Sequence, residues 1–301
     1  MFINQGQKLE IKGKFFSLSL TANKNQQFSQ ESLSQYQSFV DKVDAFFEHM
    51  KKEHIIDLLH KNKPHKKIIR LFDKVSSAPL EHISFEANGI LAQMEGIKLG
   101  FKTLKDFNAG AYRDIRRNLI KNSNSNSYYG FIFELTVASL LASNGIQFDV
   151  CSTRDGSPDF VLPINGNTYH IECRSVFSNA PEGSEEKYRL KVNQGINSKE
   201  KKKYAALNCA LLIDTTPIER LRNTGVILTN KEVIPKESKF GCIGLFTNYT
   251  RTAHGTVILT HGWSRNYFNG INPDFKNILD SFIPFNPDDE EVHMVDAFTD
   301  I

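Results

Sequence analysis

The chain has 301 residues, a formal net charge of +3 and four cysteines, and 40% of its residues are hydrophobic. This length suits one large domain or two modest ones, and the charge is too mild to indicate nucleic-acid binding by itself. No apolar run is long enough to span a bilayer, and the first residues lack the apolar core of a signal peptide. We therefore expect a cytoplasmic protein without membrane contact, whose widely spaced cysteines are reduced.

The N-terminal part of the chain is predicted to be mainly helical. Residues 14–20 alternate between apolar and polar side chains, which is typical of a short strand. Apolar residues then recur at helical spacing over 29–59, and further helices are expected over 85–107 and 112–121. The polar repeat at 122–127 is expected to form a hinge or a domain boundary.

The segment 128–176 carries the pattern with the clearest chemical meaning. A predicted helix that stops at Gly145 precedes three short strands. The Asn165-Gly166 pair predicts a tight hairpin turn between the second strand and the third. The three strands are expected over 146–151, 158–162 and 168–176.

Three acidic residues lie on these elements: Glu134 on the helix, Asp159 on the second strand and Glu172 on the third. Asp159 lies seven residues before Gly166 and Glu172 six residues after it, so we expect the two to face each other across the hairpin. Carboxylates held this close repel one another unless a hard cation binds them, and oxygen ligands suit Mg²⁺ or Mn²⁺.

A helix carboxylate, a Pro-Asp pair on a strand and a Glu-x-basic triplet on the next strand resemble the PD-(D/E)xK nuclease superfamily. The resemblance covers about 128–215 and implies catalytic roles for Glu134, Asp159, Glu172 and Arg174. It also implies that Asp159, Glu172 and the backbone carbonyl of Cys173 hold Mg²⁺ or Mn²⁺, and that Glu134 binds a second ion or a metal-bound water. Arg174 stands where the family usually has lysine, and an arginine can stabilise charge but cannot act as a base.

A very basic helix is predicted over 185–204, followed by a buried strand over 208–214 that would lie parallel to the third strand. In the resembled family a lysine from this helix sometimes supports the site, and the sequence leaves Lys187, Lys191 and Lys199 open for that role. The residues expected to contact a nucleic-acid backbone are Arg113, Arg116, Arg117, Lys187, Lys191, Lys199, Lys201 and Lys202.

The predicted fold is α/β, with a restriction-endonuclease-like core in which helices flank a mixed central sheet. The helical N-terminal region would span 1–121, and the nuclease-like domain 128–301, with additional C-terminal strands over 242–246 and 256–259 and an acidic tail. Trp263 is expected to be half-buried.

The predicted function is an Mg²⁺-dependent nuclease, an endonuclease acting on DNA in preference to RNA. Two alternatives remain at this point: a catalytically inactive nucleic-acid-binding or scaffold protein of the same fold, and a ribonuclease acting as a toxin or defence effector. A homodimer or a protein partner is also left open.

Overall fold

The computed structural model describes twelve segments of the chain: 2–3, 8–14, 17–21, 26–27, 29–52, 96–121, 128–151, 156–176, 185–216, 233–253, 256–283 and 293–296. It divides into two units. The first comprises Met1–Lys98 with Thr252–Ile258, and the second comprises Leu99–Arg251 with Leu259–Ile301. The division therefore falls near residue 98, and not at the polar repeat 122–127 as predicted. No helix in the described segments is both long and apolar enough to cross a bilayer.

The first unit contains more strand than the sequence suggested. An antiparallel hairpin of β2 (Lys8–Lys12) and β3 (Ser17–Thr21) packs against α1 (Gln30–Lys52). A second short pair joins β1 (Phe2–Ile3) to β4 (Gln26–Gln27). The strand expected over 14–20 thus begins three residues later, at Ser17, and ends at Thr21. Its partner β2 was not predicted. The predicted continuation of α1 toward residue 59 lies outside the described residues.

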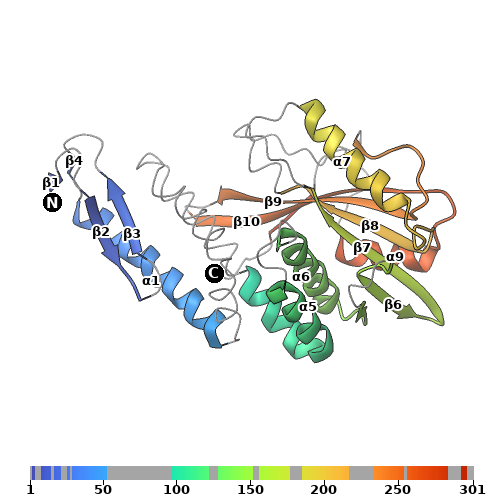
Figure 1. The fold of residues 1–301 in the computed structure, drawn as a ribbon, viewed down its shortest axis with the longest axis horizontal. Helices are drawn as coiled ribbons and strands as arrows, with labels where there is room; N and C mark the ends of the chain where they lie inside the picture. Colours follow the sequence, from blue (N-terminus) through green and yellow to red (C-terminus); the bar gives the residue numbers. More distant parts are fainter. Residues whose placement is uncertain are drawn as a thin grey trace. The chain divides into compact units, whose positions relative to one another are not determined.

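The second unit is built on a mixed sheet, which confirms the α/β class (Figure 1). Its described strands lie in the order β11-β10-β9-β8-β7-β6-β5. The central pairs β7–β8 and β8–β9 are parallel, whereas β5–β6, β6–β7 and β10–β11 are antiparallel. The strands are β5 (Asp149–Val150), β6 (Phe160–Ile164), β7 (Asn167–Ser175), β8 (Cys209–Asp214), β9 (Cys242–Ala253), β10 (Thr256–Tyr267) and β11 (His293–Asp296).

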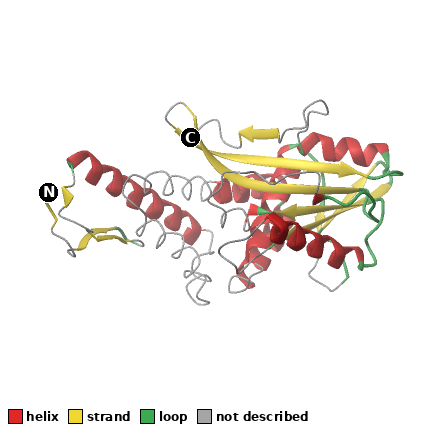
Figure 2. Cartoon of the chain, turned by 90° about the horizontal axis from the view of Figure 1, so that it is seen from above, coloured by secondary structure: helices red, strands yellow, loops and turns green. Residues whose placement is uncertain are grey.

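Helices cover both faces of this sheet (Figures 1 and 2). On one face lies α7 (Glu185–Glu200), whose Val192 and Ile196 are buried in a cluster with Leu211 and Ile213 of β8. On the other lie α5 (Ala109–Lys121) and α6 (Tyr128–Ser143), which pack against each other and follow a helical stretch over 96–107. Because α5 packs on α6 and β5, it belongs to the second unit.

The hairpin between β6 and β7 has the turn that the sequence predicted. Asn165 and Gly166 have φ angles of 51° and 76°, so both turn residues adopt the left-handed conformation that matches the twist of an antiparallel hairpin. Ile164 pairs with Asn167 beside the turn, and Phe160 pairs with Ile171 at the far end. This register fixes which residues of the two strands face each other farther from the turn.

Two features of the C-terminal half differ from expectation. Trp263 is 1% exposed, not half-buried, because its ring packs 4.6 Å from that of Phe246 and 6.4 Å from that of Phe133. Strands β9 and β10 are also longer than the predicted 242–246 and 256–259, since pairing continues to Ala253.

Helix α9 (Pro273–Phe282) was not predicted. The side chain of Asn272 accepts a hydrogen bond of 2.8 Å from the backbone N–H of Asp274, and a proline occupies the first helical turn. Asn before Pro is a common helix start. The helix buries Phe275, Leu279 and Phe282, and Phe275 stacks on Tyr169 of β7 at 4.8 Å.

Gly241 and Gly195 provide a matched test of close packing. A Cβ atom at Gly241 would lie 2.1 Å from the carbonyl oxygen of Leu207, whereas one at Gly195 would meet Val176 at an ordinary 3.6 Å. We expect Gly241→Ala to lower the free energy of unfolding by about 2–3 kcal/mol. Gly195→Ala, within α7, should instead raise it by up to about 1 kcal/mol because alanine favours helix. Urea unfolding of both variants checks this, and equal effects would contradict it.

Candidate active site

The hairpin brings Asp159 and Glu172 to the same place. The ladder of paired residues ends at Phe160–Ile171, and Asp159 lies one residue before β6, close enough to Glu172 for the two charges to interact. The backbone N–H of Asp159 donates to the carbonyl of Ile171 at 3.1 Å. The Asp159 carboxylate in turn accepts a hydrogen bond of 2.7 Å from the backbone N–H of Cys173. Asp159 is therefore held to β7 by both its backbone and its side chain.

Glu134 reaches the same region from α6. It lines, together with Asp159, a cavity of about 560 Å³ at the carboxyl end of β7, where α6 and α7 meet the sheet. Burial raises the pKa of Glu134 well above its usual range, and the charges of Asp159 and Glu172 raise it further. The cavity is lined by Gly130, Phe131, Glu134, Asp159, Cys173, Arg174, Ser175, Val176, Lys191, Gln194, Gly195, Ser198 and Lys199.

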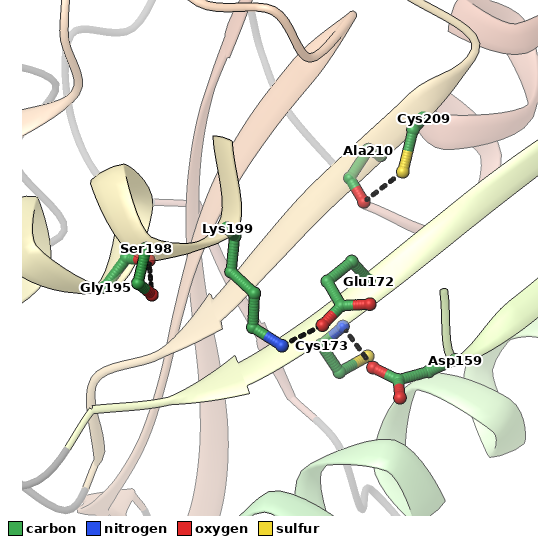
Figure 3. A network of polar contacts seen from close by, with 8 residues as sticks. All are labelled: Asp159, Glu172, Cys173, Gly195, Ser198, Lys199, Cys209 and Ala210. Carbon is green, nitrogen blue, oxygen red and sulfur yellow. Dashed lines mark hydrogen bonds and ion pairs between the residues drawn. The ribbon is translucent and has the colours of Figure 1, made fainter. Parts of the chain in front are cut away.

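Glu172 is the most deeply buried of the three carboxylates and is paired with a lysine (Figure 3). The residue is 2% exposed, and its Oε1 atom accepts a hydrogen bond from the Nζ atom of Lys199. The Tyr204 hydroxyl also lies near this carboxylate: burial raises the pKa of Tyr204, and the charge of Glu172 and a hydrogen bond to it raise that pKa further. Lys199 comes from the last turn of α7, across the face of the sheet that α7 covers.

The site holds more negative charge than its own cation can balance. Burial raises the pKa of Asp159 to about 7, and the charge of Glu172 adds to this, while the N–H of Cys173 and the charge of Lys199 act in the opposite direction. Three carboxylates thus share one nearby ammonium group. The carboxylates of Glu134 and Asp159, which line the cavity, and of Glu172 beside it are oxygen ligands of the kind that hard divalent cations prefer.

The acidic residues do not form a preassembled cage. Across the described segments, no three or more His, Cys, Asp and Glu side chains are arranged as a ready metal-binding group. The reason lies in the contacts: Asp159 is held by the backbone of Cys173, and Glu172 by Lys199. Residues of the right type are therefore gathered, while the metal ligation predicted for Glu134, Asp159, Glu172 and the Cys173 carbonyl stays a prediction.

The basic residues of the region separate into two groups. Lys199 contacts Glu172, whereas Arg174 and Lys191 are exposed side chains that line the cavity beside Gln194. The described residues include no acidic partner for Arg174 or Lys191. Of the three lysines left open by the sequence, the structure thus brings Lys199 to the carboxylates. The side chain of Lys187 lies outside what the structure describes.

The other predicted nucleic-acid contacts do not line the cavity. On α5, Arg113 donates to the carbonyl of Ala109 at 3.3 Å, Arg117 pairs with Asp114, and the Nε atom of Arg116 is buried without a described partner. Lys201 and Lys202 are exposed in the turns that follow α7. Their predicted contacts with nucleic acid therefore stay predictions, separate from the cavity.

A sequence signal could have singled out Lys199. Val192 and Ile196 form the buried stripe of α7, and Lys199 follows them at the i+7 position of the same face. Lys191 lies one residue before the stripe, and its side chain is exposed. A lysine that continues an apolar stripe must find a buried partner, and Glu172 is that partner.

Comparisons with protein-family models, with curated proteins and with solved structures find no match to this chain. The interpretation of the cavity therefore rests on its own residues, contacts and charges.

Replacing Asp159 by asparagine tests the charge balance of the metal-free site. The folded pKa of Asp159, about 7, lies above its ordinary value of 3.8, so the wild type loses stability as pH rises between these values. The asparagine side chain would keep an oxygen acceptor for the N–H of Cys173 but carry no charge. In EDTA at pH 8 we expect Asp159→Asn to raise the free energy of unfolding by about 1–3 kcal/mol.

This gain in the free energy of unfolding should shrink toward pH 4, where Asp159 is protonated in the folded wild type and roughly 40% protonated in the unfolded chain. Urea titrations at both pH values measure it. A variant that is destabilised equally at the two pH values would show that the carboxylate is not under electrostatic strain.

Proposed function

We propose that this chain is a metal-dependent nuclease with a restriction-endonuclease-like core, which hydrolyses phosphodiester bonds in DNA in preference to RNA. The observation that carries the proposal is that Glu134 and Asp159 line one cavity while Glu172 lies beside it, where its charge adds to burial in raising the pKa of both. Burying three carboxylates is costly to the fold, and such a cost is typical of a site built for a ligand.

Each residue has a role that follows from its position. Asp159 and Glu172 would hold Mg²⁺ or Mn²⁺, with the Cys173 carbonyl and Glu134 as further oxygen donors. The bound ion would supply a water of lowered pKa and neutralise charge on the phosphate. Exposed at the cavity, Arg174 is placed to stabilise negative charge that develops on the phosphate oxygens.

Lys199 weakens the main argument for an inactive protein. That argument was that arginine at position 174 cannot transfer a proton. Lys199 now places a lysine amine beside Glu172, at the acidic side of the cavity. Lys199 of α7 would thus provide the lysine amine that β7 lacks at position 174.

A cleavage assay on plasmid DNA, linear duplex, single-stranded DNA and structured RNA tests the proposal, with Mg²⁺, Mn²⁺ or EDTA. We expect metal-dependent cutting of DNA that falls at least about 100-fold in Asp159→Asn and in Glu172→Gln, because each loses a charged ligand. Glu237→Gln, at an exposed position outside the cavity, is the matched control and should retain activity.

Cutting that persists in EDTA, or that survives in both site variants, would contradict the proposal. Cutting of RNA alone would favour the ribonuclease. Binding of nucleic acid with no cutting under any metal, by a wild type as stable as its variants, would favour the inactive binder.

The two cations that line the cavity give a separate prediction about binding. If Arg174 and Lys191 each contact a phosphate, then Arg174→Ala and Lys191→Ala should each reduce the slope of log affinity against log salt by about 1. Fluorescence anisotropy with labelled DNA in EDTA measures this slope without cleavage. Lys102→Ala, an exposed lysine on the helical stretch 96–107, is the control and should leave the slope unchanged. Equal slopes in all variants would exclude these two contacts.

A further inference from the structure

The ion pair of Lys199 with Glu172 places an ammonium group on one of the carboxylates that a metal would use. We propose that Lys199 is a resident counter-ion that a divalent cation displaces from Glu172, so that its ammonium group turns into the cavity, toward a bound phosphate. This inference rests on the proposed nuclease function and adds to it an order of events: the cation first, then the lysine contact with substrate.

The burial of Glu172 is the first support. An ionised carboxylate that is 2% exposed is strongly disfavoured without a cation. Lys199 supplies that cation, and its side chain, at 18% exposed, lies between the buried carboxylate and the cavity that it lines. The lysine therefore contacts Glu172 on one side and has open space on the other.

The anchoring of α7 is the second support. Val192 and Ile196 hold the helix in the core, and its last residue, Glu200, accepts hydrogen bonds from Ser238 at 2.5 Å and from the backbone N–H of Lys239 at 3.4 Å. The backbone at Lys199 is therefore fixed on both sides. Displacement needs only rotation of the flexible four-carbon side chain and no movement of the helix.

Electrostatics supply the driving force. A divalent cation on Glu172 neutralises the carboxylate and repels an ammonium group a few ångströms away. The other charged residues that line the cavity are Glu134, Asp159, Arg174 and Lys191. A phosphate placed between the bound cation and the exposed cations would offer the released Lys199 a new anionic partner.

Limited acetylation of lysines, followed by peptide mass spectrometry, tests displacement in the wild-type protein. We expect the acetylation rate of Lys199 to rise several-fold when Mn²⁺ is added, because the amine leaves its buried partner. Lys191, which lines the same cavity, and Lys202, in the turn after α7, should not change. In Glu172→Gln, Lys199 should react rapidly with or without Mn²⁺.

Calorimetric titration with Mn²⁺ gives a second measurement. Lys199→Met removes the competing charge and should bind Mn²⁺ roughly 10-fold more tightly than the wild type, compared at a pH where affinity has become constant. Lys199→Arg keeps the charge and should bind like the wild type, as should Lys102→Met, an exposed lysine that does not line the cavity.

The outcomes separate the two proposals. Failure of the wild type to bind Mn²⁺ would overturn the metal site and this inference together. A wild type that binds Mn²⁺ through Asp159 and Glu172, but whose Lys199 acetylation is unchanged by the metal, would overturn the counter-ion role and leave the nuclease proposal standing. Weaker Mn²⁺ binding by Lys199→Met would also overturn it, since the lysine would then support the metal.

Discussion

The second unit has to accommodate a buried carboxylate beside its core. Glu172 lies on β7, where its neighbour on β8 is the apolar Leu211, and it is 2% exposed. The low polarity around Glu172 raises the free energy of a charged carboxylate, and the ammonium group of Lys199 offsets part of this increase. Asp159 and Glu134 add further negative charge nearby, which shows in the raised pKa of each. The acidic residues that the proposed chemistry needs are therefore also the residues whose burial lowers the stability of the fold.

Topology explains why these charges meet where they do. The antiparallel hairpin β6–β7 brings Asp159 near Glu172, and the parallel pair β7–β8 requires a crossover, which α7 provides. A crossover helix returns along the sheet face, so its last turn lies over the strand that precedes it. Lys199 in that last turn can therefore reach Glu172, while α6 on the opposite face supplies Glu134 at the strand end.

Local patterns in the sequence predicted the features that local geometry determines. The Asn165-Gly166 pair predicted the hairpin turn between β6 and β7. Features that depend on long-range packing were missed: the burial of Trp263 needs Phe133 and Phe246, which come from α6 and β9. Lys199, by contrast, continues the apolar stripe of Val192 and Ile196, a local pattern that distinguishes it from Lys191. The catalytic roles, the metal and the nucleic-acid substrate stay predictions.

The two-residue turn at Asn165 and Gly166 has a consequence for how this chain can vary. Side chains on a strand alternate between the two faces of the sheet, so one residue more or less in the turn would shift β7 by one position relative to β6. Asp159 and Glu172 would both remain in the sequence, yet the position of one relative to the other would change. A related sequence that keeps the pocket must therefore also keep the length of this turn. The turn lies at the surface, several residues away from the carboxylates.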